Sequence, residues 1–361
     1  MVKEGEVVKM IAETTLTAKI KNSVNKLLET IPFLKTNDIS KQPVISMNKQ
    51  PDLAFTLDDG IHSMYIIIEI KTNGEPRYIR SAIQQLKEYV SKLNNSYGMV
   101  AAPYISYDTG NICKENGVGY IDTAGNCFIN FSRVFIERKN YPNPNVSKRT
   151  LRSIFSNKAT RVLRVLLCNP KRLWQVQELA KEANVSLGLA YKVKERLLDL
   201  EYTADKKRRI SIIRPQELLN EWANNYSFRK NKIYDFYSTD TVKQMEIKLA
   251  EYCKAKRITY ALTLFSGAAR VAPYARYTRG FAYIQGNIKD IADTLKLKGV
   301  DSGANFTIME PYDESLFYGT REMENLIVVS DVQLYLDLVS YKGRGEESAQ
   351  FLLEQKLKPQ W

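Results

Sequence analysis

The sequence is poor in residues that several large classes of protein need. It contains one histidine, His62, which excludes a multi-histidine metal site and any Ser-His-Asp triad placed away from that residue. Its four cysteines form no Cys-x-x-Cys pair, so they predict neither a zinc site nor a disulfide framework. No apolar run reaches the length of about eighteen residues that a membrane span needs, and the N-terminal residues lack a signal-peptide core. We therefore expect a cytoplasmic protein.

Positive charge is concentrated in one segment of the chain. The formal net charge is +13, and residues 148–232 contain 20 Lys and Arg against 8 Asp and Glu, a net of +12. Charge concentrated in one segment favours a phosphate-binding surface over the alternative of a generally soluble exterior. We expect double-stranded DNA as the partner of this segment and association with the nucleoid.

Two short apolar runs on either side of a polar turn predict a β-hairpin. The first run follows Asp52, and the second, residues 64–70, carries Glu69 and leads into Lys71. Alternation along a strand puts Glu69 and Lys71 on one face, and the hairpin brings Asp52 to the same end. Two carboxylates suit Mg²⁺, with Mn²⁺ as a substitute, while a lysine offsets negative charge that develops at a phosphate.

A helix expected over residues 77–93 completes this candidate site. It carries Gln85 and Tyr89 four positions apart, and therefore on one face. Glu29, on an earlier helix, is a further candidate ligand, although a solvated helix residue explains it equally well. The predicted catalytic residues are Asp52, Glu69, Lys71 and Gln85, and the predicted metal ligands are Asp52, Glu69 and Ile70.

This pattern resembles the PD-(D/E)xK, or restriction-endonuclease-like, superfamily. The core of that superfamily is a hairpin with D and ExK, followed by a helix that often carries a QxxxY-like motif. The matching residues here are Asp52, Glu69, Lys71, Gln85 and Tyr89. The resemblance implies a nuclease-like mixed sheet. Two alternatives stay open: a surface Glu–Lys pair beside an amphipathic helix, and a nuclease fold that has lost its chemistry.

The basic segment has the pattern of a winged helix-turn-helix. The expected elements are helices over 159–167, 176–183 and 187–200, followed by two strands within 202–213. Ser186 is a good N-cap for the third helix, which is predicted to bury Ala190, Val193, Leu197 and Leu200. In such a motif the recognition helix enters the major groove, and flanking basic residues contact phosphates. A small helical packing module with a solvated charge run is the alternative.

The predicted DNA contacts come from the third helix and from the tip of the two strands. They are Ser186, Gly188, Tyr191, Lys192, Lys206, Lys207, Arg208 and Arg209. Trp174 and Trp222 are predicted to be core aromatics rather than base-stacking residues. Winged helices often bind paired half-sites, which makes a homodimer a reasonable expectation.

The chain is predicted to be a multidomain α/β protein. We expect a nuclease-like domain over residues 1–146, a winged helix over 147–215 and a C-terminal α/β domain over 216–361. Besides the hairpin and the helix over 77–93, the first domain is predicted to contain helices over about 16–30 and 111–117 and strands near 43–47, 97–104, 119–122 and 127–131. In the C-terminal domain we expect strands over 259–265, 282–285 and 325–329, with helices ending at 256 and beginning near 267 and 330. The C-terminal domain has no recognisable activity. Asp331 and Asp337 fall on a predicted helix, where we interpret them as solvated or capping residues.

Taken as a whole, the sequence resembles the AbiEi-type antitoxin and transcriptional-regulator family of type IV toxin–antitoxin systems. The matching segments are 75–80, 84–86, 117–126, 185–189, 301–305, 310–313 and 332–338. The resemblance implies a bacterial or mobile-element regulator whose winged helix binds operator DNA. It also implies a nucleotidyltransferase-like toxin as partner, neutralised with the help of the C-terminal region.

Three functions remain in view from the sequence, and the third of them is a pure interaction protein whose C-terminal domain holds a toxin. The first is a DNA-binding regulator of the AbiEi type with a silent or auxiliary nuclease-like domain. The second is a Mg²⁺-dependent DNA endonuclease, targeted by the winged helix, in phage defence or in a mobile element. An intact Asp52, Glu69, Lys71 and Gln85 set exceeds what a simple repressor needs, and this keeps the second function open.

Overall fold

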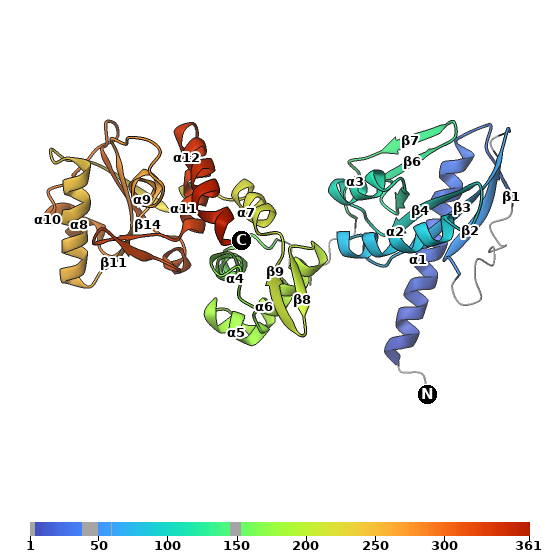
Figure 1. Cartoon of the computed structure of the whole chain (residues 1–361), viewed down its shortest axis with the longest axis horizontal. Helices are drawn as coiled ribbons and strands as arrows, with labels where there is room; N and C mark the ends of the chain where they lie inside the picture. Colours follow the sequence, from blue (N-terminus) through green and yellow to red (C-terminus); the bar gives the residue numbers. More distant parts are fainter. Residues whose placement is uncertain (1–3, 38–49, 59, 145–152) are drawn as a thin grey trace. The chain divides into compact units, whose positions relative to one another are not determined.

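A computed structural model of the chain describes residues 4–37, 50–58, 60–144 and 153–361 (Figure 1). The chain forms two compact units. Unit 1 comprises Met1–Thr150 with Asp199–Glu201, and unit 2 comprises Leu151–Leu198 with Tyr202–Trp361. Both units mix helices with β-sheet, so the α/β class is confirmed. No helix in the described part of the chain has the length and apolarity that crossing a membrane requires.

Unit 1 is built around one mixed sheet. Its elements are α1 (Glu4–Glu29), β1 (Lys35–Asn37), β2 (Leu53–Asp58), β3 (Ser63–Ile70), α2 (Pro76–Val90), β4 (Ser96–Ala102), α3 (Tyr107–Glu115), β5 (Gly119–Asp122), β6 (Cys127–Phe131) and β7 (Val134–Arg138). The strands lie in sequence order from β1 to β7. Only the central β3–β4 and β4–β5 pairs are parallel, and the other pairs are antiparallel.

Strand β3 is apolar on both faces because helices cover both sides of the sheet. Ile66 and Ile68 belong to the core cluster that contains α1, whereas Ile67 belongs to the cluster that contains α2 and α3. This alternation follows from the two-residue period of a strand. Glu69 therefore emerges on the α2 face and Ile70 on the α1 face.

Most elements predicted for unit 1 are present. The strands at 119–122 and 127–131 are confirmed, and so are the hairpin and the helix that follows it. Helix α1 begins well before the predicted residue 16, and α3 begins at Tyr107 because Ser106 caps it. Strands β1 and β7 were not predicted. The strand expected near 43–47 lies outside the described residues.

The first part of unit 2 contains three helices and a β-hairpin. They are α4 (Asn157–Cys168), α5 (Val176–Glu182), α6 (Leu187–Asp199), β8 (Thr203–Lys206) and β9 (Arg209–Ile212). These elements match the predicted ranges to within two residues. Helix α6 buries Ala190, Val193 and Leu197 as predicted, but its last fully packed leucine is Leu198, and Leu200 is only half-buried.

The rest of unit 2 surrounds a second seven-stranded mixed sheet. The strand order is β13-β10-β14-β12-β11-β16-β15. The strands are β10 (Lys232–Tyr237), β11 (Thr259–Leu262), β12 (Gly280–Gln285), β13 (Lys298–Gly299), β14 (Phe306–Glu310), β15 (Arg321–Met323) and β16 (Leu326–Val328). The helices are α7 (Pro215–Asn224), α8 (Val242–Lys256), α9 (Leu264–Val271), α10 (Ile288–Thr294), α11 (Asp331–Val339) and α12 (Arg344–Leu352), with short turns η1 (Phe228–Lys230), η2 (Glu314–Phe317), η3 (Leu353–Leu357) and η4 (Lys358–Gln360).

Helix α11 is the centre of unit 2. It packs against α9 and α12 and also against α4 and α7. The predicted domain boundary near residue 215 thus lies inside one compact unit. Both Trp174 and Trp222 are buried, as predicted.

The interpretation of Asp337 as a solvated or capping residue is wrong. Its side chain is fully buried and accepts hydrogen bonds from Tyr226, Tyr283, Thr263 and Gln333. Burial raises the pKa of this carboxyl, and the four donors oppose that rise. The sequence places Asp337 on an amphipathic helix but does not reveal that every face of that helix is covered.

Asp331 is also less solvated than expected. It lies in the first turn of α11, is 8% exposed and forms an ion pair with Arg321. The residue that caps this helix is Ser330, whose side chain accepts a hydrogen bond from the N–H of Gln333. An acidic residue in a first turn still complements the positive end of the helix dipole.

Candidate functional site

The antiparallel pairing of β2 with β3 brings Asp52 beside Glu69. Leu53 pairs with Ile68, so the residues just beyond that pair, Asp52 and Glu69, face each other at the end of the hairpin. The Oδ2 atom of Asp52 accepts a hydrogen bond of 2.7 Å from the backbone N–H of Ile70. This bond fixes one carboxylate oxygen of Asp52 and leaves the other for a ligand.

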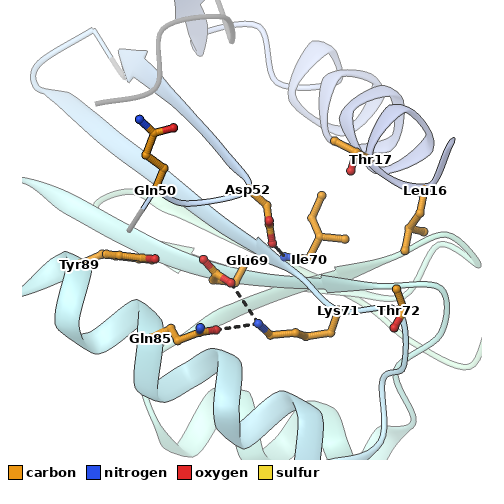
Figure 2. A pocket seen from close by; sticks show the side chains of 10 residues that line it. All are labelled: Leu16, Thr17, Gln50, Asp52, Glu69, Ile70, Lys71, Thr72, Gln85 and Tyr89. Carbon is orange, nitrogen blue, oxygen red and sulfur yellow. Dashed lines mark hydrogen bonds and ion pairs between the residues drawn. The ribbon is translucent and has the colours of Figure 1, made fainter. Parts of the chain in front are cut away.

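Lys71 joins Glu69 to helix α2. Its Nζ lies 3.1 Å from Glu69 Oε2 and donates a 2.6 Å hydrogen bond to Gln85 Oε1. Figure 2 shows the Lys71 amine between these two side chains, with Asp52 on the neighbouring strand. Lys71 and Gln85 come from different elements, and the shared α2 face of the sheet brings them together.

These residues line a cavity of about 480 Å³ (Figure 2). Its walls are Leu16, Thr17, Gln50, Asp52, Glu69, Ile70, Lys71, Thr72, Gln85 and Tyr89. All five predicted motif residues and Ile70 are therefore at one site. Glu29 is not among them, because α1 presents Leu16 and Thr17 to the cavity. No sequence motif singles out Leu16, Thr17, Gln50 or Thr72, which reach the cavity only through the packing of α1 and the strand ends.

Burial and charge act together on Glu69. Its side chain is 4% exposed, and burial raises its pKa above the usual 4.5, with the nearby Asp52 charge adding to the rise and Lys71 opposing it. The phenol pKa of Tyr89 is also raised, mainly by burial and then by the charges of Glu69 and Asp52. A cation placed between Asp52 and Glu69 offsets the repulsion that these shifts report.

The donor set fits a hard divalent cation. Among the described residues, Asp52 Oδ1 and Glu69 Oε1 accept no hydrogen bond, so each has an oxygen to offer. The described part of the chain has no group of three or more His, Cys, Asp or Glu side chains placed to hold a metal ion. Mg²⁺ commonly uses one or two carboxylates and keeps several waters, so a two-carboxylate site suits it and a tetrahedral zinc site does not fit.

A second candidate surface lies on helix α6. Ser186 caps the helix, since its Oγ accepts a 3.2 Å hydrogen bond from the N–H of Leu189. Gly188, Tyr191 and Lys192 are exposed, with Tyr191 at 53% of its surface. Leu187, which was not predicted as a contact, is 51% exposed on the same helix. A helix that leaves large apolar and aromatic side chains in solvent has a face suited to a partner.

The hairpin β8–β9 presents four basic side chains at its tip. Lys206, Lys207, Arg208 and Arg209 are all exposed. The two central residues adopt left-handed backbone angles, with φ of 54° at Lys207 and 65° at Arg208. Asp205 supports the turn by accepting a 2.8 Å hydrogen bond from the N–H of Arg208. The four cations thus project from a closed two-residue turn.

One comparison with known protein families gives a match in the C-terminal part of the chain. A family model described as a transcriptional regulator, the AbiEi antitoxin of a type IV toxin–antitoxin system, matches residues 211–358. This range covers α7 and the whole second sheet. No curated protein matches the chain.

One solved structure, a repair endonuclease from Pyrococcus abyssi, is similar to part of the chain. The sequence identity is 19% and the TM-score is 0.21. The alignment covers 28% of this chain and 46% of the endonuclease, so this chain spans less than half of that protein. A likeness of this size carries no functional argument.

Proposed function

We propose that the protein is a DNA-binding regulator of the AbiEi-like antitoxin type. The observation that carries the proposal is the surface formed by α6 and the β8–β9 tip. The order of helix, helix, turn, capped helix and basic hairpin is that of a winged helix-turn-helix, with α6 as the recognition helix. The antitoxin model matched at residues 211–358 supports the same role from an independent part of the chain.

In this proposal the two parts of the surface have different tasks. Ser186, Gly188, Tyr191 and Lys192 lie on the helix that enters the major groove, where base edges can be distinguished. The four cations of the hairpin tip contact phosphates, which supply affinity without sequence information. Operator recognition by a homodimer and neutralisation of a nucleotidyltransferase-like toxin complete the proposed role.

The proposal is tested by measuring the affinity for duplex DNA as a function of salt concentration. We expect replacement of Lys206, Lys207, Arg208 and Arg209 by Gln to weaken binding to DNA from upstream of the encoding gene and to flatten the salt dependence by about 0.9 per lost phosphate contact. The matched control replaces Lys243, Lys254, Lys256 and Lys289, which are exposed on other helices, by Gln and changes the net charge equally. Equal affinity of both variants would contradict the proposal.

A second candidate function is metal-dependent cleavage of DNA. It is favoured by the convergence of Asp52, Glu69, Lys71 and Gln85 at one cavity, which resembles the arrangement expected of a PD-(D/E)xK site. Asp52, Glu69 and the Ile70 backbone would hold Mg²⁺ or Mn²⁺, and the bound cation would supply Lewis-acid stabilisation of a phosphate oxygen. Lys71 is held by Glu69 and Gln85 where its charge can stabilise negative charge at a phosphate.

Incubation with supercoiled DNA in Mg²⁺, Mn²⁺ or EDTA tests this second function. We expect Asp52→Asn and Lys71→Met to abolish nicking while duplex binding is kept. Asp108→Asn and Lys92→Met, at exposed positions of the same unit, are the matched controls. If the unaltered protein shifts the DNA in a gel but does not cut it, the cleavage function is contradicted and only the regulator function remains.

A further inference from the structure

The C-terminal sheet carries a second cavity, far along the chain from the site in unit 1. It has a volume of about 860 Å³, which is within the range of small-molecule pockets. Its lining comes from β10, β12, β14, η1 and the residues that follow α11. Asp235 pairs with Thr307 and Thr307 with Phe281 across three adjacent strands, so these three residues share one face of the sheet.

The floor of this cleft is aromatic. Tyr341 stacks on Phe228 with ring centroids 6.1 Å apart and meets Phe281 edge-on at 5.9 Å. Both phenylalanines are buried, whereas Tyr341 is half-buried. Tyr341 is therefore the ring that the cleft offers to a ligand, and the phenylalanines fix its orientation.

The cleft carries a net positive charge. Arg279 is held by Asp235 and by Thr307, 2.8 Å from its Nε, and lies over the Phe281 ring. At the rim, the side chains of Arg229 and Lys342 are exposed and have no acidic partner within the described residues. Asp235 is the single acidic residue of the lining, and Arg279 already neutralises it. The free charge of the cleft is thus positive.

We propose that this cleft binds a nucleotide. The base stacks on Tyr341, and the phosphates lie against Arg229 and Lys342. An aromatic platform beside cations is the combination that holds bases and phosphates in other nucleic-acid sites. Asp235 Oδ2 accepts no hydrogen bond from the described residues and is free to accept one from a ribose hydroxyl. This site is separate from the proposed DNA surface and goes beyond the proposed function.

Isothermal titration of the full chain with ATP and with GTP, in EDTA, tests the proposal. We expect one of the two nucleotides to bind. The matching nucleoside, which lacks the phosphates, and inorganic triphosphate, which lacks the base, should each bind at least about tenfold more weakly. Arg229→Gln with Lys342→Gln should weaken nucleotide binding about tenfold without changing the melting temperature. Tyr341→Leu should weaken it to a similar degree.

The matched control is Lys254→Gln with Lys256→Gln, which removes the same charge from exposed positions outside the cleft. Unchanged binding in this control supports the assignment. The proposal is overturned by the absence of binding for both nucleotides at millimolar concentration. It is overturned equally by binding that survives the Arg229 and Lys342 changes, or that disappears when the hairpin cations at 206–209 are replaced.

Discussion

Gly188 is a helical glycine for which the folded chain has no steric use. A Cβ atom built there meets no atom within 4 Å, and its backbone angles are not left-handed. Glycine inside a helix costs about 0.5–1 kcal/mol relative to alanine. The absence of a side chain at this exposed position would let another molecule approach the backbone closely, as the proposed DNA binding requires.

Gly188→Ala should therefore move stability and binding in opposite directions. We expect the free energy of unfolding to rise by less than about 1 kcal/mol, because Gly188 is the second residue of α6 and the glycine penalty is full only in a helix interior, while affinity for operator DNA falls. Urea unfolding and duplex titration measure the two quantities on the same sample. Asn224→Ala, at the exposed end of α7, is the control for a change in helix propensity alone. A stabilised variant with unchanged DNA affinity would remove the proposed role of Gly188.

Glu69 gives a pH dependence whose sign follows from its raised pKa. Because the folded pKa lies above the unfolded value of 4.5, the folded chain binds this proton more tightly. The protonated Glu69 carboxyl therefore adds to the free energy of unfolding below pH 4.5, and this contribution is lost as the pH rises through the folded pKa. Glu69→Gln should reduce this loss and raise the melting temperature near neutral pH.

Mg²⁺ provides the complementary measurement for Glu69. A bound cation favours the charged carboxylate, so we expect Mg²⁺ to raise the melting temperature of the unaltered protein more at neutral than at acidic pH. Glu69→Gln should lose most of this effect. Circular dichroism is the suitable probe, because all three tryptophans lie in unit 2. An equal Mg²⁺ effect in both proteins would argue against a cation at Asp52 and Glu69.

At the scale of elements, the β8–β9 hairpin has a strained backbone at Lys207 and Arg208, which are among its four basic residues. Two-residue hairpin turns with positive φ at both positions favour Asn-Gly, whereas this chain has Lys207 and Arg208 there. Such strain costs on the order of 1 kcal/mol or more per residue. The two strained positions therefore coincide with two of the proposed phosphate contacts.

Replacement of Lys207 by Asn and Arg208 by Gly should relieve the strain. We expect a gain of about 1 kcal/mol or more in stability, together with weaker DNA binding and a smaller salt dependence. Lys207→Gln with Arg208→Gln is the control that removes the charge but keeps the strain. If the Asn-Gly variant binds DNA as tightly as the unaltered chain, the hairpin tip is not a phosphate contact.

The elements that were predictable are those with a strong local signal. The ExK strand, its hairpin partner and α6 each have a clear period of apolar residues, and Ser186 supplies a cap. Strands β10 and β14 were missed because their pairing partners lie far apart in the sequence. Alternation in β10 is weak because its exposed face carries the large apolar side chains Ile233 and Tyr237, which are 38% and 47% exposed.

At the scale of the whole molecule, a buried polar network joins the proposed DNA-binding part of unit 2 to its C-terminal sheet. Arg164 of α4 is fully buried, donates a 2.6 Å hydrogen bond to Gln333 of α11 and lies over the Trp222 ring. Gln333 in turn donates to Asp337. This buried hydrogen bond ties α4 to α11, so we expect unit 2 to unfold as one cooperative structure.

Asp337→Leu should show this cooperativity. Loss of the acceptor removes four buried hydrogen bonds, so we expect unit 2 to lose about 3–5 kcal/mol of stability. Tryptophan fluorescence during urea unfolding should report one transition for Trp174 near the hairpin and Trp222 on α7, shifted as a whole. Asp293→Leu, at an exposed helix position, should change stability by less than about 0.5 kcal/mol. Two separate transitions in unit 2 would contradict a single cooperative structure.

The sequence by itself determined the local chemistry of this protein. Strands and helices place residues at fixed intervals, so the local pattern already shows which side chains share a face. This holds for the motif residues Asp52, Glu69, Lys71 and Gln85 and for the basic segment around α6. Only the tertiary structure decided what surrounds these residues. In the folded chain Asp337 is buried, and Lys71 forms a hydrogen bond with Gln85. Glu29 does not line the cavity. The tertiary structure also assembled the C-terminal cleft from segments more than a hundred residues apart, since such contacts depend on the packing of whole elements.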